Sequence, residues 1–278
     1  MSSTSQSSVA APKAWPDVLP LAGSDLVEIL AAGVNDLRAG GCYSLFFGTF
    51  YGVGGLILLV LARFYNVPYL IYPLAMGFVL IAPFMATGLY DISRRLENGE
   101  ALSWAGVLGS IRFAAGRDLR WMALITSFTF VIWMDIAALL TFGFLSGEMT
   151  GFKDLLTQIF TTPSGLLFLA VGNTVGALIA LVVFSFSAVS FPMLYDRDVD
   201  FVTAMVSSIR LVLKNPVVML SWGAIIGVLT VISILSAFLG LIVTLPVLGH
   251  ATWHLYRRGI APSGEISAAA RAASHPIG

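Results

Sequence analysis

Residues 217–256 form an unbroken apolar stretch, VVMLSWGAIIGVLTVISILSAFLGLIVTLPVLGHATWHLY, without a single Asp, Glu, Lys or Arg. Drawn as one α-helix, this stretch would be roughly 60 Å long, which is twice the hydrocarbon thickness of a bilayer. We therefore predict that it folds into two membrane-spanning helices joined by a very tight turn at 236–240.

The rest of the chain is similarly apolar. Hydrophobic residues make up 58% of the 278 residues and charged residues 11%, whereas a soluble domain carries roughly 25% charged residues. A helix that crosses a bilayer needs about 20 predominantly apolar residues. Four further stretches meet this requirement: Gly41–Leu61, Val67–Leu89, Trp121–Leu145 and Ser164–Leu194. The sequence thus predicts an all-α, polytopic membrane protein with six transmembrane helices.

The placement of Lys and Arg supports this count, because cytoplasmic loops collect positive charge. With six spans, one side of the membrane holds 13 of the 15 basic residues and the other side holds only Arg63 and Lys153. The 13 residues are Lys13, Arg38, Arg94, Arg95, Arg112, Arg117, Arg120, Arg197, Arg210, Lys214, Arg257, Arg258 and Arg271. We therefore expect both termini in the cytoplasm. A net charge of zero argues against nucleic acid as a partner.

The two ends of the chain differ in composition from the apolar middle. Residues 1–22 are rich in Ser, Ala and Pro, and residues 259–278 are similarly rich in small residues, which is typical of disordered segments. We predict disordered tails at both ends and a six-span membrane domain at 23–258. Cys42 is the single cysteine, so a disulfide within the chain is excluded.

Three short segments share an amphipathic pattern, and a predicted span follows each of them. They read DLVEILAAGVNDLRAGG (25–41), ALSWAGVLGSIRFAAGRD (101–118) and DFVTAMVSSIRLVLKNP (200–216). In the third segment Asp200 is placed to cap a helix that Pro216 stops. Its apolar stripe comprises Val202, Met205, Val206, Ile209 and Leu213. The pattern predicts three cytoplasmic interfacial amphipathic helices in a threefold helix-plus-hairpin repeat; ordinary helical loops are the alternative.

Two polar residues within predicted spans are candidate functional residues, because polar groups are costly inside a membrane. Asp135 is an acidic residue well inside the third predicted span, and Asn173 lies in the fourth. A proton-carrying or ion-coordinating role is one interpretation of Asp135. A neutral carboxyl group that is hydrogen-bonded across helices is the other.

Pairs of glycines recur with the spacing that allows helices to approach closely. The pairs are Gly48 and Gly52, Gly172 and Gly176, and Gly223 and Gly227. We expect them to serve in helix packing, within the bundle or between protomers, rather than in transport.

His250 and His254 lie one helical turn apart at the end of the last span, just before Arg257 and Arg258. Residues four apart share a helix face, so both imidazoles could reach one metal or one haem iron. Ligation would need further ligands, and no other span offers them in an obvious register. We therefore expect polar anchors that bond to interfacial helices or lipid headgroups, in the aromatic and basic belt at the membrane interface.

The remaining motifs give no sign of catalysis. Asp196, Asp198 and Asp200 resemble a cation site in spacing, but no glycine turn or distal glutamate completes a calcium loop. A solvated loop with a helix cap is the favoured interpretation. Nucleophile, phosphate-loop and HExxH motifs are lacking. The sequence therefore predicts no catalytic, cofactor or metal site.

Three segments of this sequence resemble one family. They are GLYDISRRLENGE (88–100), LYDRDVDFVTAMVSSIRLVLKNPVVMLSWG (194–223) and FLGLIVTLPVLGHATWHLYRR (238–258). Together they resemble the DUF2189 family of predicted bacterial integral membrane proteins, with a likeness that extends from about residue 25 to residue 258. The resemblance implies an inner-membrane location and no assigned function. Relatives labelled cytochrome c oxidase subunit I are a poor guide, because that catalytic subunit needs more spans and more histidines than the three present here.

Two functional hypotheses follow. The first is a non-catalytic organising, accessory or assembly factor, compatible with a place near a respiratory complex, whose partners are the lipid bilayer and a membrane protein or a second copy. The second is a small-solute or proton-coupled transporter that uses Asp135 and Asn173. Transporters commonly have inverted repeats, whereas the predicted repeat here is parallel and threefold, which favours the first hypothesis.

Overall fold

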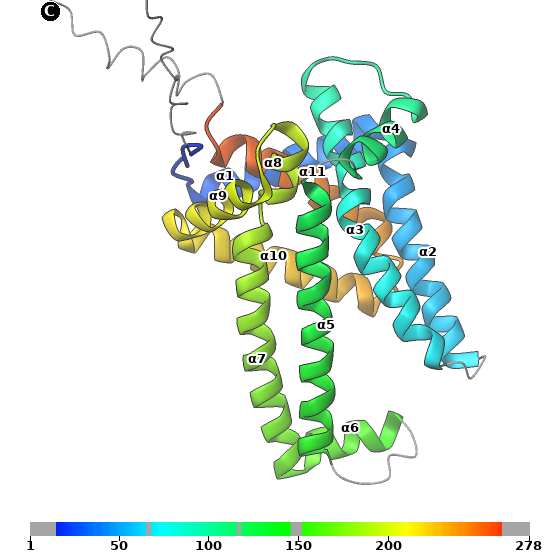
Figure 1. The fold of residues 1–278 in the computed structure, drawn as a ribbon. Helices are drawn as coiled ribbons and strands as arrows, with labels where there is room; N and C mark the ends of the chain where they lie inside the picture. The colour runs from blue at the N-terminus through cyan, green and yellow to red at the C-terminus, as the bar shows by residue number, and fades with distance from the viewer. Residues whose placement is uncertain (1–14, 65–67, 116–117, 146–151, 263–278) are drawn as a thin grey trace, which may run out of the picture.

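Figure 1 shows the computed structural model, which describes residues 15–64, 68–115, 118–145 and 152–262. The described residues are largely helical, and an isolated antiparallel bridge joins Val18 to Ile260. The helices are α1 (Gly23–Gly40), α2 (Cys42–Phe64), α3 (Pro68–Glu97), α4 (Trp104–Ala115), α5 (Leu119–Phe144), α6 (Phe152–Thr161), α7 (Pro163–Ser187), α8 (Ser190–Asp196), α9 (Phe201–Lys214), α10 (Pro216–Leu235) and α11 (Leu241–Gly259). The described chain is all-α, as the sequence predicted.

A short helix lies in each of the three segments with the amphipathic pattern. α1, α4 and α9 each end close to the start of a longer helix, which is α2, α5 and α10 respectively. Asp200 caps α9 as predicted, because its Oδ1 accepts a hydrogen bond from the Thr203 N–H at 2.8 Å. The buried face of α9 differs from the predicted apolar stripe. Small side chains such as Ala204 and Ser207 face the protein, whereas Val202 and Leu213 are exposed.

Among the described residues, four helical stretches are long and apolar enough to cross a membrane, namely Cys42–Leu61, Leu119–Phe144, Pro163–Asp196 and Pro216–Leu235. They correspond to the first, third, fourth and fifth predicted spans. α3 covers the second predicted span and continues to Glu97, and only part of its side chains is described. α11 lies at the sixth and carries two histidines and two arginines within 19 residues, which lowers its hydropathy. These four stretches therefore support the prediction of a membrane protein. The second and sixth predicted spans are not among them, so the count of six spans stays a prediction.

The long apolar stretch at 217–256 breaks where the sequence predicted. α10 ends at Leu235 and α11 begins at Leu241. In the turn, Ala237 and Phe238 have φ angles of 53° and 67°, a conformation that costs an L-residue roughly 1–2 kcal/mol. Ser236 stabilises the turn, since its Oγ donates to the Ser233 carbonyl (2.8 Å) and accepts from the Gly240 N–H (2.9 Å).

The helices gather at one end of the molecule. In Figure 1, α1, α8, α9 and α11 lie together at this end, while α5 and α7 run side by side away from it and α6 lies at their far end. α10 is inclined steeply to the α5–α7 pair in this view. α2 packs directly on α11, and a Cβ atom at Gly48 would collide with the Ile242 carbonyl. At Gly52 a Cβ atom would lie 2.8 Å from Ile242 Cγ1.

The two ends of the helical part are joined by backbone hydrogen bonds. The Leu19 N–H donates to the Gly259 carbonyl and the Ala261 N–H donates to the Asp17 carbonyl, both at 2.9 Å. The Asn215 side chain secures the same segment, because its Oδ1 accepts from the Leu21 N–H (2.8 Å). Residues 17–21 and 259–261 are thus tied to the helical part by hydrogen bonds, and the disorder of the two tails stays a prediction. Residues 1–14 and 263–278 lie outside the described residues.

Candidate functional site

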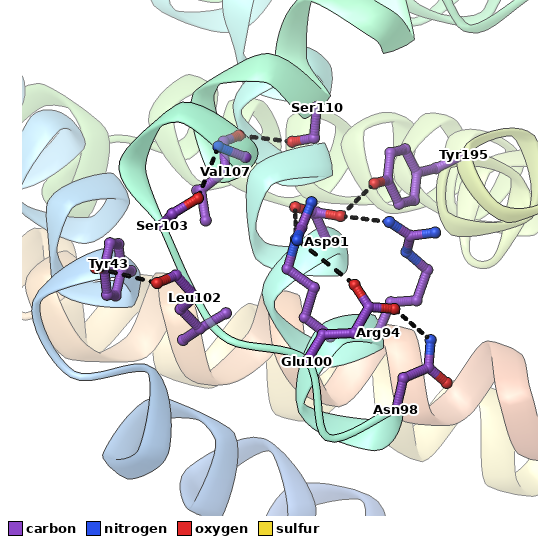
Figure 2. Close-up of polar contacts among 12 residues, drawn as sticks. Tyr43, Asp91, Arg94, Asn98, Glu100, Leu102, Ser103, Val107, Ser110 and Tyr195 are labelled. Carbon is purple, nitrogen blue, oxygen red and sulfur yellow. Dashed lines mark hydrogen bonds and ion pairs between the residues drawn. The ribbon is translucent and has the colours of Figure 1, made fainter.

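Asp91, near the end of α3, is a fully buried carboxylate at the centre of a polar cluster (Figure 2). Its Oδ1 accepts hydrogen bonds from the Tyr195 hydroxyl (2.7 Å) and from Arg94 Nη2 (2.8 Å), and its Oδ2 accepts from Arg95 Nε (2.7 Å). The hydrogen bond to Asp91 raises the pKa of Arg95, partly offset by desolvation. Glu100 lies 3.5 Å from Arg95 Nη1. The carboxylate is therefore saturated by partners from α3 and α8.

A second link of the same kind joins α8 to α11. The Tyr256 hydroxyl donates to Asp196 Oδ2 (2.6 Å) and accepts from Arg197 Nε (2.6 Å). Both tyrosines follow a buried leucine, in the sequences Leu-Tyr-Asp at 194–196 and Leu-Tyr-Arg at 255–257, and Leu-Tyr-Asp occurs again at 89–91. All three tyrosine rings surround Trp253. Their centroids lie 6.5 Å, 6.5 Å and 5.7 Å from its ring for Tyr90, Tyr195 and Tyr256 respectively.

His250 is fully buried on α11, between α2 and α3. Its Nδ1 lies 2.8 Å from Ser93 Oγ, and its Nε2 lies 2.9 Å from Ser44 Oγ. A neutral imidazole has one donor and one acceptor, so the two serine hydroxyls can satisfy both ring nitrogens. The structure therefore places His250 as a polar bridge between three helices.

His254 faces the edge of the cluster. Its Nε2 lies 2.8 Å from Asp36 Oδ2 on α1, and its Nδ1 lies 3.6 Å from Glu97 Oε1 on α3. Burial raises the pKa of Asp36, but hydrogen bonds from His254 and Ser93 outweigh this effect, so the pKa lies below its usual value. The two histidines thus point at different partners. Among the described residues, no group of three or more His, Cys, Asp or Glu side chains is arranged to hold a metal ion.

The two arginines that follow the histidines join further acidic residues. Arg258 pairs with Glu28 (2.6 Å) and Asp25 (3.1 Å) of α1. Arg257 Nε lies 3.4 Å from Glu97 Oε2. The end of α11 is therefore tied to α1 and α3 by ion pairs as well as by hydrogen bonds.

The predicted polar residues of the spans lie far from this cluster. Asp135 is exposed in the outward stripe of α5 that also contains Ile132 and Leu139. Asn173 is exposed on α7, where its Nδ2 donates to the Leu169 carbonyl of its own helix (2.7 Å). The structure therefore brings neither residue into a shared polar site.

The predicted glycine pairs fall into two groups. Gly48 and Gly52 lie at the close contact with α11, and Gly176 faces Trp133 on α5 at 3.0 Å from a Cβ position. At Gly172 and Gly227 no atom of the described chain lies within 4 Å of a Cβ position, and at Gly223 the nearest is Phe184 Cζ at 3.6 Å. Within the described chain, Gly172 and Gly227 therefore have no close helix neighbour, whereas Gly223 is in ordinary contact with Phe184 of α7.

Sequence reasoning did not single out the residues that carry the cluster, which are Ser44, Asp91, Ser93, Tyr195 and Tyr256. Asp91 and Tyr195 stood inside the segments that carried the family resemblance, and a signal was available in the recurrence of Leu-Tyr-Asp at 89–91 and 194–196. Of the three closely spaced aspartates at 196, 198 and 200, Asp196 accepts a hydrogen bond from Tyr256 and Asp200 caps α9, as the helix-cap interpretation predicted.

With four helices long and apolar enough to cross a bilayer, the chain fits the class of integral membrane proteins. Residues 71–196 match the family model described as "Predicted integral membrane protein (DUF2189)", which is the family that the sequence resembled. The match includes Asp91 and Tyr195 and ends before 248–258, whose place in the family stays a prediction. No curated protein and no solved structure matches the chain.

Proposed function

We propose that the protein is a non-catalytic scaffold of the bacterial inner membrane, which organises or helps to assemble a partner complex or a patch of lipid. The observation that carries this proposal is the pairing of the buried polar groups with one another. Asp91 is bound by Tyr195 of α8 and by two arginines of its own helix, and both ring nitrogens of His250 contact serines of other helices. Such a cluster fixes the positions of the helices relative to one another.

The surface of the amphipathic helices supports this role. Val202 and Leu213 of α9, and Trp104 and Leu108 of α4, are large apolar side chains that remain exposed. Exposed apolar side chains on a helix beside a membrane fit the headgroup boundary of the bilayer or a membrane-bound partner. The buried cluster would hold these helices at fixed positions.

The proposed topology has six spans with both termini in the cytoplasm. The distribution of 13 basic residues against two supports it. In this arrangement α3 and α11 provide the second and sixth spans, and the polar cluster lies at the cytoplasmic end of the helices.

The proposed repeat comprises α1–α3, α4–α8 and α9–α11, and the contacts between the Leu-Tyr motifs support it. Tyr195 of the second unit donates to Asp91 of the first, and Tyr256 of the third donates to Asp196 of the second. In the third unit Arg257 stands where the others have aspartate, and it pairs with Glu97 of the first unit. Each unit is thus linked to the next in a closed ring.

A transporter is the alternative, and the geometry favours it less. Asp135 and Asn173 lie on exposed faces of α5 and α7, and neither residue lines the cavity between α3, α5, α7 and α10. Proton-coupled transport would need such groups along a polar path.

Two measurements on the same preparation separate these functions. Purification in mild detergent followed by mass spectrometry should find a membrane protein at near-stoichiometric amount, and proteoliposomes should show no solute or proton uptake above that of empty liposomes. Uptake that Asp135→Asn abolishes would contradict the scaffold and favour the transporter.

A further inference from the structure

A cavity of about 1030 Å³ lies between α3, α5, α7 and α10. Along α7 its lining extends from Gly176 to Ser187, a rise of roughly 17 Å. At the Ser187 end it reaches Phe191 of α8, the helix that also carries Tyr195. The cavity therefore begins beside the Asp91 cluster and runs down the bundle.

The walls of this cavity offer almost no hydrogen-bond donors. Three hydroxyl groups line it, and each donates to its own helix: Thr126 to the Met122 and Ala123 carbonyls, Thr129 to that of Ile125 and Ser187 to that of Val183. The other lining side chains are apolar, aromatic or glycine, and the Trp133 indole N–H is the one further side-chain donor among them. A polar solute would lose its hydrogen bonds to water in such a site without gaining others. A hydrocarbon chain makes no such hydrogen bonds and would not pay this cost.

The cavity is continuous with the outer apolar surface of the helices. Leu181 of α7 and Leu220 of α10 both line it, and they are 42% and 51% exposed. α5, α7 and α10 contain candidate membrane spans, so the opening faces the hydrocarbon layer. Its length of roughly 17 Å is close to half of the roughly 30 Å hydrocarbon thickness, which is the depth of one leaflet.

We propose that this cavity binds an acyl chain of a glycerophospholipid from the leaflet beside the Asp91 cluster. The wall chemistry selects hydrocarbon, the length matches one leaflet, and the opening gives lateral entry from the bilayer. This inference requires a membrane protein but does not depend on the scaffold role.

Glycines in the wall allow the cavity to be filled without disturbing a neighbour. A Cβ atom at Gly227 meets no atom within 4 Å, and at Gly223 the nearest atom is Phe184 Cζ at 3.6 Å. Gly227→Leu and Gly223→Leu should therefore fill the cavity and keep the fold. Gly172→Leu is the matched control, because it adds the same side chain to open space on α7 outside the cavity.

The test is native mass spectrometry of the full chain after detergent delipidation and re-addition of a defined phosphatidylethanolamine. The wild type and Gly172→Leu should retain about one phospholipid per chain, and both cavity variants should lose most of it, with unchanged melting temperatures for all four proteins. Absence of bound phospholipid from the wild type would overturn the proposal, as would equal retention by Gly227→Leu and the wild type. If one cavity variant fails to fold, the other decides. The proposal would also be overturned if the wild-type protein, as purified from cells, carried a prenyl lipid in place of a phospholipid.

Discussion

Asp91→Asn removes the negative charge that lies between Arg94 and Arg95 and keeps the size of the side chain. Removing one partner of a buried ion pair costs about 3–5 kcal/mol. The Asp91 side chain is 1% exposed, but those of Arg94 and Arg95 are 38% and 21% exposed, so solvent screening reduces this cost. We expect a loss of roughly 2–3 kcal/mol in the free energy of unfolding.

The assay is thermal unfolding of the purified protein in detergent, followed by tryptophan fluorescence. At roughly 2–4 °C per kcal/mol for a chain of this size, the melting temperature should fall by about 4–12 °C. Asp17→Asn is the matched control, because Asp17 is exposed and only its backbone contacts the helical part. Tyr195→Phe removes one hydrogen bond to Asp91 and should cost about 1–2 kcal/mol.

The double variant decides whether the two residues act together. If Tyr195 stabilises the protein through Asp91, Asp91→Asn and Tyr195→Phe combined should cost less than the sum of the single changes. Additive effects, or an Asp91→Asn melting temperature equal to that of Asp17→Asn, would refute the reasoning that this cluster fastens the helices.

Reporter fusions after Asn215 and at the C-terminus should report cytoplasm, and a fusion within 147–161 should report periplasm; a periplasmic C-terminus would contradict the topology. Asp135→Asn should leave expression and melting temperature nearly unchanged, because the carboxyl is exposed. A large drop in stability would show that a partner buries it. His250→Gln should lower the free energy of unfolding by on the order of 1–3 kcal/mol, because it disturbs two buried serines, and His254→Gln should lower it less. Metal analysis of the wild type should find no near-stoichiometric zinc, copper or iron. A metal bound at nearly one per chain and lost in either variant would show ligation. The lowered pKa of Asp36 stabilises the fold above its usual value of 3.8, so the melting temperature should fall as the pH drops through the lower folded value, and Asp36→Asn should flatten this dependence.

Local patterns predicted the elements well where the local signal was strong. The break at 236–240 followed from length alone, since no single helix of 40 apolar residues fits a bilayer. The capping of α9 by Asp200 was also predicted, because a cap depends on residues three apart. Less was predictable at the chain ends, where the pairing of Leu19 with Gly259 depends on segments 240 residues apart.

The contacts of the Asp91 cluster were also hard to predict, because its residues lie far apart along the chain. Asp91 and Tyr195 are 104 residues apart, and His250 and Ser44 are 206 apart. Burial and spacing indicate that a polar residue in an apolar helix needs a partner, but they do not indicate which one. The histidines drew attention because they are rare here, whereas the serines that contact His250 resemble many other serines in the chain.

The backbone hydrogen bonds between Asp17–Leu19 and Gly259–Ala261 impose a parity rule on membrane insertion. Segments that pair directly must lie on the same side of the bilayer, so the chain between them crosses it an even number of times. Four crossings and six crossings both satisfy this rule, whereas five do not. Because Gly259–Ala261 lie at the end of α11, the pairing can form only after the helices from α1 to α11 have been made.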